Sequence, residues 1–264
     1  MQIDGKNITA IASDLDGTLI FWPDVYLSDR VLSFVRKILD GGLIFVAASG
    51  RQYENVAKLF APVKDEIYFV CENGSMVVYR DRIILLDCIE EETANELIRD
   101  IRRYLGNINT IVSSEGGVYG EACNADFISF VNEKRAQCFK LVDDFSMIKA
   151  PKNKISVVFP DGNADHGDML RQKYSDRLSV VDAGGGWLDF TSKTANKGSG
   201  LRFLKENVLG KDTAFACFGD SENDISMFPE SAVSFAMSHS STDVRSRADH
   251  GCSDVVELLS GLMG

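Results

Sequence analysis

The sequence feature that most constrains the fold is an apolar run that ends abruptly in two aspartates. Residues 8–12 are ITAIA, and residues 13–18 are SDLDGT. The run has the length and the β-branched content of a buried strand. In an extended backbone, residues i and i+2 point the same way, so Asp14 and Asp16 would face one small volume. Two carboxylates held there repel each other unless a cation or a shared proton relieves the repulsion.

Taken alone, these aspartates also allow a simpler interpretation. Asp-Gly is a common turn pair, and Gly17 lets the chain turn sharply just beyond Asp16. A short motif also matches by chance often enough that a polar turn and a charged site both stay open at this point.

Helices alternate with apolar strands along the first part of the chain. Ser28 can cap a helix that runs through Asp40, whose apolar residues share one face. A second apolar strand follows at residues 43–48, then a helix that ends at Pro62, then a third strand at residues 68–71. Such repetition with short links predicts an α/β fold, a Rossmann-like parallel sheet with helices on both faces.

The pattern changes near residue 83 and resumes near residue 185. The segment between these points opens with a hairpin strand, continues with an amphipathic helix from about Glu90 to Leu105, and then mixes short strands and helices. We predict an inserted α+β domain over residues 83–184, within a core formed by residues 1–82 and 185–264. The strand at residues 187–190 is assigned to that core.

Three apolar strands each end in polar residues that chemistry can use. The first ends at Asp14 and Asp16, the second at Ser49, and a later strand at residues 213–218 ends at Asp220. In an open parallel sheet these ends lie along one edge, where ligands bind, so we expect these side chains to meet. Lys197, which begins a predicted helix, can reach the same edge.

The residue types at this edge favour phosphoryl chemistry. Carboxylate oxygens of Asp14, Asp16 and Asp220 suit Mg²⁺, and no histidine cluster or cysteine pair suggests zinc. The Ser49 hydroxyl, the Gly50 amide and the Lys197 ammonium are donors suited to phosphate oxygens. A carboxylate nucleophile beside Mg²⁺ and a lysine is one way to accept a phosphoryl group.

Composition limits the partners. The chain has 264 residues, a net charge of −11 and six cysteines without a CxxC pair. An acidic surface repels nucleic acid and anionic membranes, so we expect neither as a partner. No signal-peptide pattern opens the sequence, and no apolar run approaches the roughly 20 residues that span a bilayer. We therefore expect a cytoplasmic protein, as a monomer or small homo-oligomer.

Four motifs, taken in order, resemble those of the haloacid dehalogenase superfamily. They are DLDGT at 14–18, SGR at 49–51, KG at 197–198 and GDSEND at 219–224. The insertion is similar to the α/β cap of the Cof-type sugar-phosphate phosphatases, and ENG at 72–74 looks like that subfamily's turn after the third strand. In one departure, SHS at 238–240 stands where relatives usually carry a glycine-asparagine pair, in a loop that borders the site.

The resemblance implies a role for each site residue. Asp14 would attack phosphorus and become an aspartyl phosphate, and Asp16 would protonate the leaving alcohol and then activate water. Mg²⁺ would be held by Asp14, by the main-chain carbonyl of Asp16 and by Asp220. The phosphoryl oxygens would be held by Ser49, Gly50, Lys197 and Asn223. Asp224 would support the metal site. Apart from the resemblance, we expect Arg51 to contact the substrate, to form a salt bridge or to cap its helix.

The function implied by the resemblance is a Mg²⁺-dependent phosphatase that acts on small phosphorylated metabolites, above all sugar phosphates. Two alternatives stay open. A sugar phosphomutase shares a similar core and cap, and it needs a second phosphate site, usually built from arginines of the insertion. A non-catalytic phosphometabolite-binding protein could carry the same fold, although every core motif residue is present here.

Overall fold

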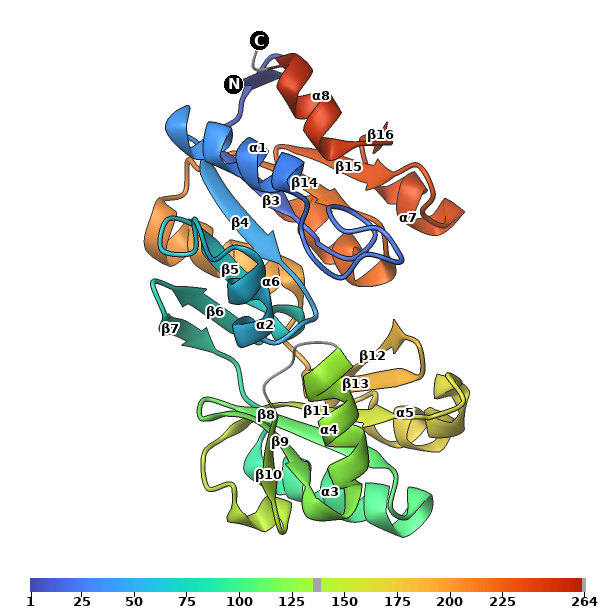
Figure 1. Ribbon diagram of the computed structural model, residues 1–264. Coiled ribbons are helices and arrows are strands. Elements are labelled where there is room, and N and C mark those ends of the chain that lie inside the picture. The colour runs from blue at the N-terminus through green and yellow to red at the C-terminus, as the bar shows by residue number, and fades with distance from the viewer. Residues whose placement is uncertain (135–138, 263–264) are drawn as a thin grey trace. The chain divides into compact units, whose positions relative to one another are not determined.

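The computed structural model describes residues 1–134 and 139–262 (Figure 1). The chain forms two compact units. The first, which we call the core unit, consists of Met1–Leu85 and Asn196–Gly264, and the second, which we call the inserted unit, consists of Leu86–Ala195. Within the described residues, no helix combines the length and the apolar character that crossing a membrane requires.

The core unit is built on an eight-stranded sheet. In sheet order its strands are β16 (His250–Cys252), β15 (Val233–Met237), β14 (Phe215–Gly219), β3 (Ala10–Ser13), β4 (Ile44–Ala48), β5 (Tyr68–Cys71), β6 (Met76–Tyr79) and β7 (Arg82–Leu86). The six strands from β16 to β5 pair in parallel, and β6 pairs with β5 in the antiparallel sense. Strands β1 (Gln2–Ile3) and β2 (Lys6–Asn7) form a separate two-stranded sheet.

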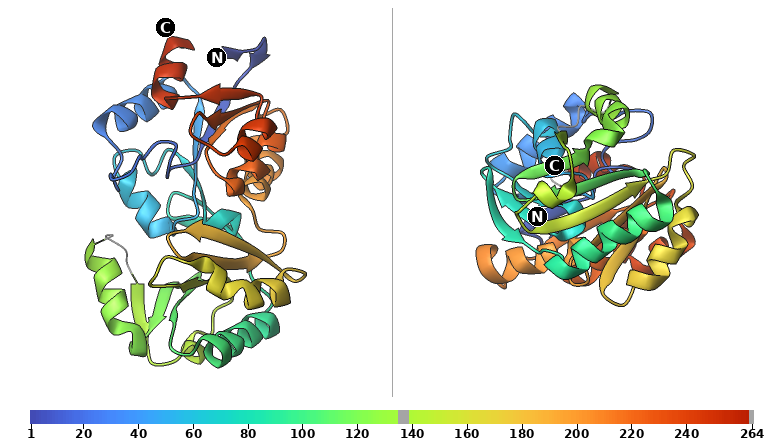
Figure 2. Two further views of the ribbon diagram at one scale, coloured as in Figure 1. Left: turned by 90° about the vertical axis from the view of Figure 1, so that its right-hand side faces the viewer. Right: turned by 90° about the horizontal axis from the view of Figure 1, so that it is seen from below.

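Helices cover both faces of this sheet, as parallel strands buried on both sides require. The helices of the core unit are α1 (Asp29–Asp40), α2 (Tyr53–Leu59), α6 (Lys197–Leu204), α7 (Thr242–Arg247) and α8 (Val255–Leu262). Helices α1 and α2 lie on one side, and α6 and α7 lie on the other, in orange and red in the left view of Figure 2. This arrangement confirms the predicted Rossmann-like core, and Ser28 caps α1 as expected.

The two faces bury different apolar sets. On the side of α6, alanines and valines of β3 and β4 pack against Leu201, Leu204 and the short 3₁₀ helix η6 (Glu222–Glu230). Small side chains such as Ala10 and Ala12 let this layer approach the strands closely. On the other side, Phe45 of β4 packs against Phe60 just after α2. The sheet is thereby fixed from both sides, which gives the loops at its edge a rigid base.

The inserted unit carries its own six-stranded sheet. In sheet order its strands are β10 (Phe139–Val142), β9 (Gly117–Glu121), β8 (Asn109–Ser114), β11 (Lys152–Val158), β13 (Trp187–Ser192) and β12 (Leu178–Gly184). Its helices are α3 (Glu91–Leu105), α4 (Ala125–Lys134) and α5 (Asp168–Tyr174). Residues of α3 and α5 share one apolar core with this sheet, and residues of α4 share a second, smaller one.

One strand assignment and the two domain edges predicted from the sequence differ from the structure. Residues 187–190 were assigned to the core, but β13 pairs with β11 and β12 in the inserted unit, which ends at Ala195 rather than at residue 184. The predicted edge at residue 83 would cut through β7, which belongs to the core sheet. In both cases the strand pattern is present in the sequence, but the pairing partner is set by contacts that local pattern does not encode.

Candidate active site

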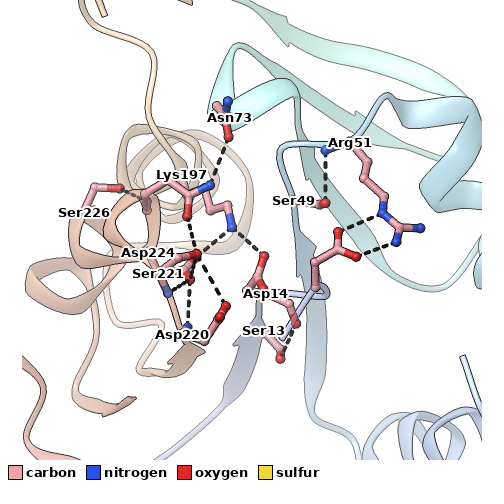
Figure 3. A network of polar contacts seen from close by, with 12 residues as sticks. Ser13, Asp14, Ser49, Arg51, Asn73, Lys197, Asp220, Ser221, Asp224 and Ser226 are labelled. Carbon is pink, nitrogen blue, oxygen red and sulfur yellow. Dashed lines mark hydrogen bonds and ion pairs between the residues drawn. The ribbon is translucent and has the colours of Figure 1, made fainter. Parts of the chain in front are cut away.

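Strand register brings the three predicted strand ends to one level of the core sheet. Ser13, the last residue of β3, lies opposite Phe218 of β14 and opposite Ala47 of β4. The residues that follow these positions therefore leave the sheet side by side at its carboxyl edge. Figure 3 shows Asp14, Ser49 and Asp220 around one small volume at this edge.

Lys197 lies at the centre of this group. Its Nζ donates to Asp14 Oδ1 at 2.5 Å and to Asp224 Oδ1 at 2.6 Å, and its side chain is 1% exposed. The lysine is the first residue of α6, and Asn196 caps that helix in a reciprocal pair of hydrogen bonds with Ser199. This cap fixes the first residue of the helix. The ammonium group of Lys197 is therefore positioned by the helix start as well as by its contacts with the carboxylates.

Asp224 holds both the lysine and the loop that follows β14. While its Oδ1 accepts from Lys197, its Oδ2 accepts from the backbone amides of Asp220 at 2.9 Å and Ser221 at 3.0 Å. Both oxygens of this fully buried carboxylate are thus occupied. Asp224 is therefore better placed to hold Lys197 and this loop than to bind a metal directly.

Negative charge exceeds positive charge in this cluster. Oxygens of Asp14, Asp220 and Asp224 all lie within 4.8 Å of one another, and one buried ammonium faces them. Burial raises the pKa of Asp14 well above its ordinary value; Lys197 opposes this rise, and Asp224 and Asp220 add to it. Burial and Asp224 likewise raise the pKa of Asp220. For Lys197, burial lowers the pKa, but the attraction of Asp14 and Asp224 outweighs it and the net shift is upward.

The site fits a divalent cation. Three ionised carboxylates against one ammonium leave a net charge of −2, which one Mg²⁺ ion would neutralise. Asp14 Oδ2 is buried and has no hydrogen-bond partner among the described residues, so this oxygen is available as a ligand. Asp220 adds a half-buried carboxylate beside it. Hard oxygen ligands of this kind are the ones that Mg²⁺ prefers.

Gly17 is needed for the close approach of two strand-end loops. Its φ of +88° lies in the left-handed region, which favours glycine. A Cβ at this position would lie 2.3 Å from Asp220 Oδ2. The turn after Asp14 and Asp16 therefore leaves room for Asp220. The polar turn is thus part of the charged site, and the two interpretations of DLDGT are compatible.

The predicted phosphate-binding residues lie around Asn73, to which the sequence assigned no role. Asn223 Nδ2 donates to Asn73 Oδ1 at 3.2 Å, and a Cβ on Gly50 would lie 2.8 Å from the same oxygen. Ser49 is buried, and its hydroxyl accepts from the amide of Arg51 at 3.1 Å. Asn73 has a positive φ of 55° in the turn after β5. The ENG sequence after a predicted strand was the signal that could have identified it.

Asp16 and Arg51 form a two-point ion pair. Arg51 Nε donates to Asp16 Oδ2 at 2.8 Å, and a terminal guanidinium nitrogen donates to Asp16 Oδ1. Of the roles expected for Arg51, the structure shows the salt bridge, made with a carboxylate of the protein. Asp16 is the most exposed aspartate of the site, with its side chain 53% exposed, and this pair fixes its orientation.

His239 is a neighbour of the site that the sequence marked only as a departure from the family pattern. Its Nε2 lies 3.6 Å from Asp220 Oδ2, and its ring packs edge to face against Phe21 at 6.0 Å between centroids. The Ser-His-Ser loop therefore borders the acidic cluster, as expected. The aromatic contact with Phe21 links residues 218 positions apart, so no local sequence signal could have shown it.

The fold is shared with solved structures. A haloacid dehalogenase-like hydrolase from B. subtilis has a TM-score of 0.80 and 19% identity, covering 97% of this chain and all of the other. A subclass IIB sugar phosphatase of the same superfamily has a TM-score of 0.79 and 16% identity, covering 97% and 99%. At these identities the likeness concerns the fold.

Sequence comparison leads to the family. The chain is 26% identical over 248 residues to the 5-amino-6-(5-phospho-D-ribitylamino)uracil phosphatase of Escherichia coli, covering 92% of this chain and 90% of the relative. The family model of haloacid dehalogenase-like hydrolases matches residues 11–257, which include every predicted site residue and the whole inserted unit. The chain therefore belongs to the haloacid dehalogenase-like hydrolases, as its four motifs predicted.

Proposed function

We propose that the protein is a Mg²⁺-dependent phosphatase that hydrolyses small phosphorylated metabolites through an aspartyl-phosphate intermediate. The observation that carries this proposal is the buried contact between Lys197 and Asp14 at the carboxyl edge of the sheet. The lysine fixes one oxygen of the carboxylate, and the other, also buried, has no hydrogen-bond partner within the part of the chain that the structure describes. A carboxylate so oriented beside a fixed cation is suited to accept a phosphoryl group.

The reaction would proceed in two displacements. In the first, an oxygen of Asp14 forms a bond to phosphorus while the bond from phosphorus to the leaving oxygen breaks, and Asp16 gives that oxygen its proton. In the second, Asp16 takes a proton from water, the water oxygen bonds to phosphorus, and Asp14 leaves as a free carboxylate. In the structure Asp16 accepts from Arg51 through both of its oxygens, so Asp16 would give up one of these contacts to carry the proton, while the other contact keeps its carboxyl group oriented.

The remaining site residues would stabilise charge on the phosphoryl group. Lys197, Ser49, Asn223 and the amide of Gly50 are the donors at this edge that suit its oxygens. Mg²⁺, held by Asp14, Asp220 and the carbonyl of Asp16, would supply further positive charge at the transferring group.

We infer that the substrate is a phosphorylated sugar or sugar derivative in the cytoplasm. The Escherichia coli relative is named for a phosphorylated ribitylamino compound of uracil, and one structural neighbour is named a sugar phosphatase. Both names agree with a small phosphate monoester rather than a phosphorylated protein. We expect the chain to act alone or as a small homo-oligomer.

Two arginines of the inserted unit that a phosphomutase could use are already paired. Arg102 pairs with Glu121 and Asp144, and Arg177 pairs with Glu96. Their charges are thus largely compensated within the unit, so they are poor candidates for a second phosphate site. Arg135, a further arginine of the insertion, lies outside the described residues.

A phosphate-release screen over phosphorylated sugars and sugar alcohols, with Mg²⁺ and with a chelator, tests the proposal. We expect release that requires Mg²⁺ and that is lost in the Asp14→Asn variant. The exposed Asp65→Asn variant serves as a matched control and should keep the wild-type rate. Isomerised phosphate in place of free phosphate would identify a mutase, and binding without turnover would identify a binding protein; either result would reject the phosphatase proposal.

A further inference from the structure

A histidine approaches one carboxylate of the acidic cluster from the loop after β15. His239 Nε2 lies 3.6 Å from Asp220 Oδ2, and the histidine side chain is 50% exposed. Strands β14 and β15 pair in parallel, with Gly219 opposite Ala236, so the loops that follow them leave the sheet side by side. The topology of the core unit therefore brings these two side chains together.

Asp220 is the least firmly held carboxylate of the acidic cluster. Asp14 accepts a hydrogen bond from a buried lysine, and Asp224 accepts from the same ammonium group and from two backbone amides. Within the described part of the chain, the side chain of Asp220 accepts one hydrogen bond, from the Ser221 hydroxyl to Oδ1 at 3.4 Å. The imidazole of His239 faces its other oxygen, Oδ2.

The imidazole is itself held in place. The amide of Ser238 donates to the carbonyl of Cys252 at 2.8 Å, and the carbonyl of Ser238 accepts from Arg245 at 3.3 Å. The Phe21 ring packs edge to face against the imidazole, with 6.0 Å between the ring centroids. These contacts fix the direction from which His239 faces the carboxylate, so little further ordering is needed for the two groups to meet.

We propose that His239 is a positioning residue that orients Asp220 for the binding of Mg²⁺. The inference rests on the phosphatase function proposed above and on its metal site. At 3.6 Å the two atoms are not yet hydrogen-bonded, and a shift of about half an ångström brings them to hydrogen-bond distance. An N–H at Nε2 that donates to Oδ2 then fixes the rotation of the Asp220 carboxylate.

This role acts on metal affinity more than on the chemical step. Carboxylates that bind metals are usually held by hydrogen bonds from neighbouring groups, and loss of such a neighbour typically costs about 10–100-fold in affinity or activity. The imidazole faces Asp220 and makes no hydrogen bond with Asp14 or Asp16, within the residues that the structure describes. Its removal should therefore weaken Mg²⁺ binding while the proposed nucleophile and the proposed acid stay in place.

Two substitutions at one position separate the hydrogen bond from the packing. His239→Leu keeps an apolar side chain against Phe21 and removes both ring nitrogens, whereas His239→Gln keeps an N–H donor of similar reach. In calorimetric titration of Mg²⁺ into the substrate-free protein, we expect Kd to rise by about 10–100-fold in His239→Leu and clearly less in His239→Gln. His250→Leu is the matched control; this histidine pairs with Asp4, outside the acidic cluster, so Kd should not change.

A second substitution tests the same role without altering the histidine. Phe21→Ala removes the ring that packs against the imidazole, so it should weaken Mg²⁺ binding in the wild-type background and have no such effect in His239→Leu. Thermal unfolding in the presence of a chelator verifies that each variant is folded. In phosphate release by His239→Leu, the Mg²⁺ concentration for half-maximal activity should rise with Kd, and the loss of kcat at saturating Mg²⁺ should be much smaller.

The outcomes distinguish this inference from the proposed activity. An unchanged Kd for Mg²⁺ in His239→Leu, or an equal loss in His239→Leu and His239→Gln, would overturn the positioning role and leave the phosphatase function intact. A wild-type protein that neither binds Mg²⁺ nor releases phosphate would reject the proposed function, and with it this inference.

Discussion

Replacing Lys197 by methionine tests the electrostatic organisation of the site most sharply. The lysine is a buried cation that faces Asp14, Asp220 and Asp224, and its two contacts of 2.5 and 2.6 Å are made with buried carboxylates. Methionine keeps most of the volume and removes the charge. The variant thus leaves three neighbouring carboxylates without their lysine.

The expected cost follows from the burial of the pair. Breaking a buried ion pair by removing one partner costs about 3–5 kcal/mol, because the remaining charge is left uncompensated. For a chain of this size, that loss corresponds to a fall of roughly 6–20 °C in Tm. Urea unfolding in the presence of a chelator measures it, and amide hydrogen exchange of β3 and β14 assigns the loss to the core sheet. Exposed Lys211→Met is the matched control, with an expected change within about 0.5 kcal/mol.

A double variant separates charge from packing. Adding Asp14→Asn to Lys197→Met removes one of the repelling carboxylates, so the double variant should recover part of the lost stability, with a coupling of about 0.5–3 kcal/mol. A Lys197→Met protein as stable as the wild type would refute the proposed charge balance. Strict additivity in the double variant would show instead that the loss comes from packing.

Two further predictions concern the turn and the metal. Gly17→Ala should abolish most phosphate release, because its Cβ would displace Asp220, whereas Gly42→Ala, at a similar positive φ with open space around it, should lose only stability; equal activities of the two variants would contradict the steric account. Without metal, the pKa values of Asp14 and Asp220 are raised in the folded state. Protonation of these two carboxyl groups therefore stabilises the metal-free fold fully below about pH 4, and this stabilisation is lost as pH rises through the raised pKa values. Mg²⁺ competes with these protons, so the gain in Tm on adding saturating Mg²⁺ should grow between about pH 4 and pH 7, and an equal gain at both pH values would reject this linkage.

The order of strands and the edge that holds the site could be predicted because both depend on local pattern. Apolar runs separated by amphipathic helices specify a parallel sheet, and the polar residues after β3, β4 and β14 then meet at one edge. The start of α6 at Lys197 could also be predicted from the sequence, because Asn196 is a good capping residue. These features need no knowledge of distant contacts.

The features that could not be predicted all depend on contacts between distant residues. The sheet to which β13 belongs is set by pairing with β11 and β12, and its strand pattern suits either sheet equally well. The contact of Arg51 with Asp16, and that of Phe21 with His239, join side chains from separate loops. Such contacts follow from the geometry of the folded backbone, which residue spacing alone does not give.

The most direct test of the central claim is to identify the residue that carries the phosphoryl group during turnover. Rapid quenching of the reaction followed by hydroxylamine converts an acyl phosphate to a hydroxamate, which mass spectrometry locates in the peptide. We predict a hydroxamate on Asp14 alone, formed and lost at rates compatible with phosphate release, and absent from Asp14→Asn. A modification on Asp16, or steady phosphate release by Asp14→Asn, would contradict the account.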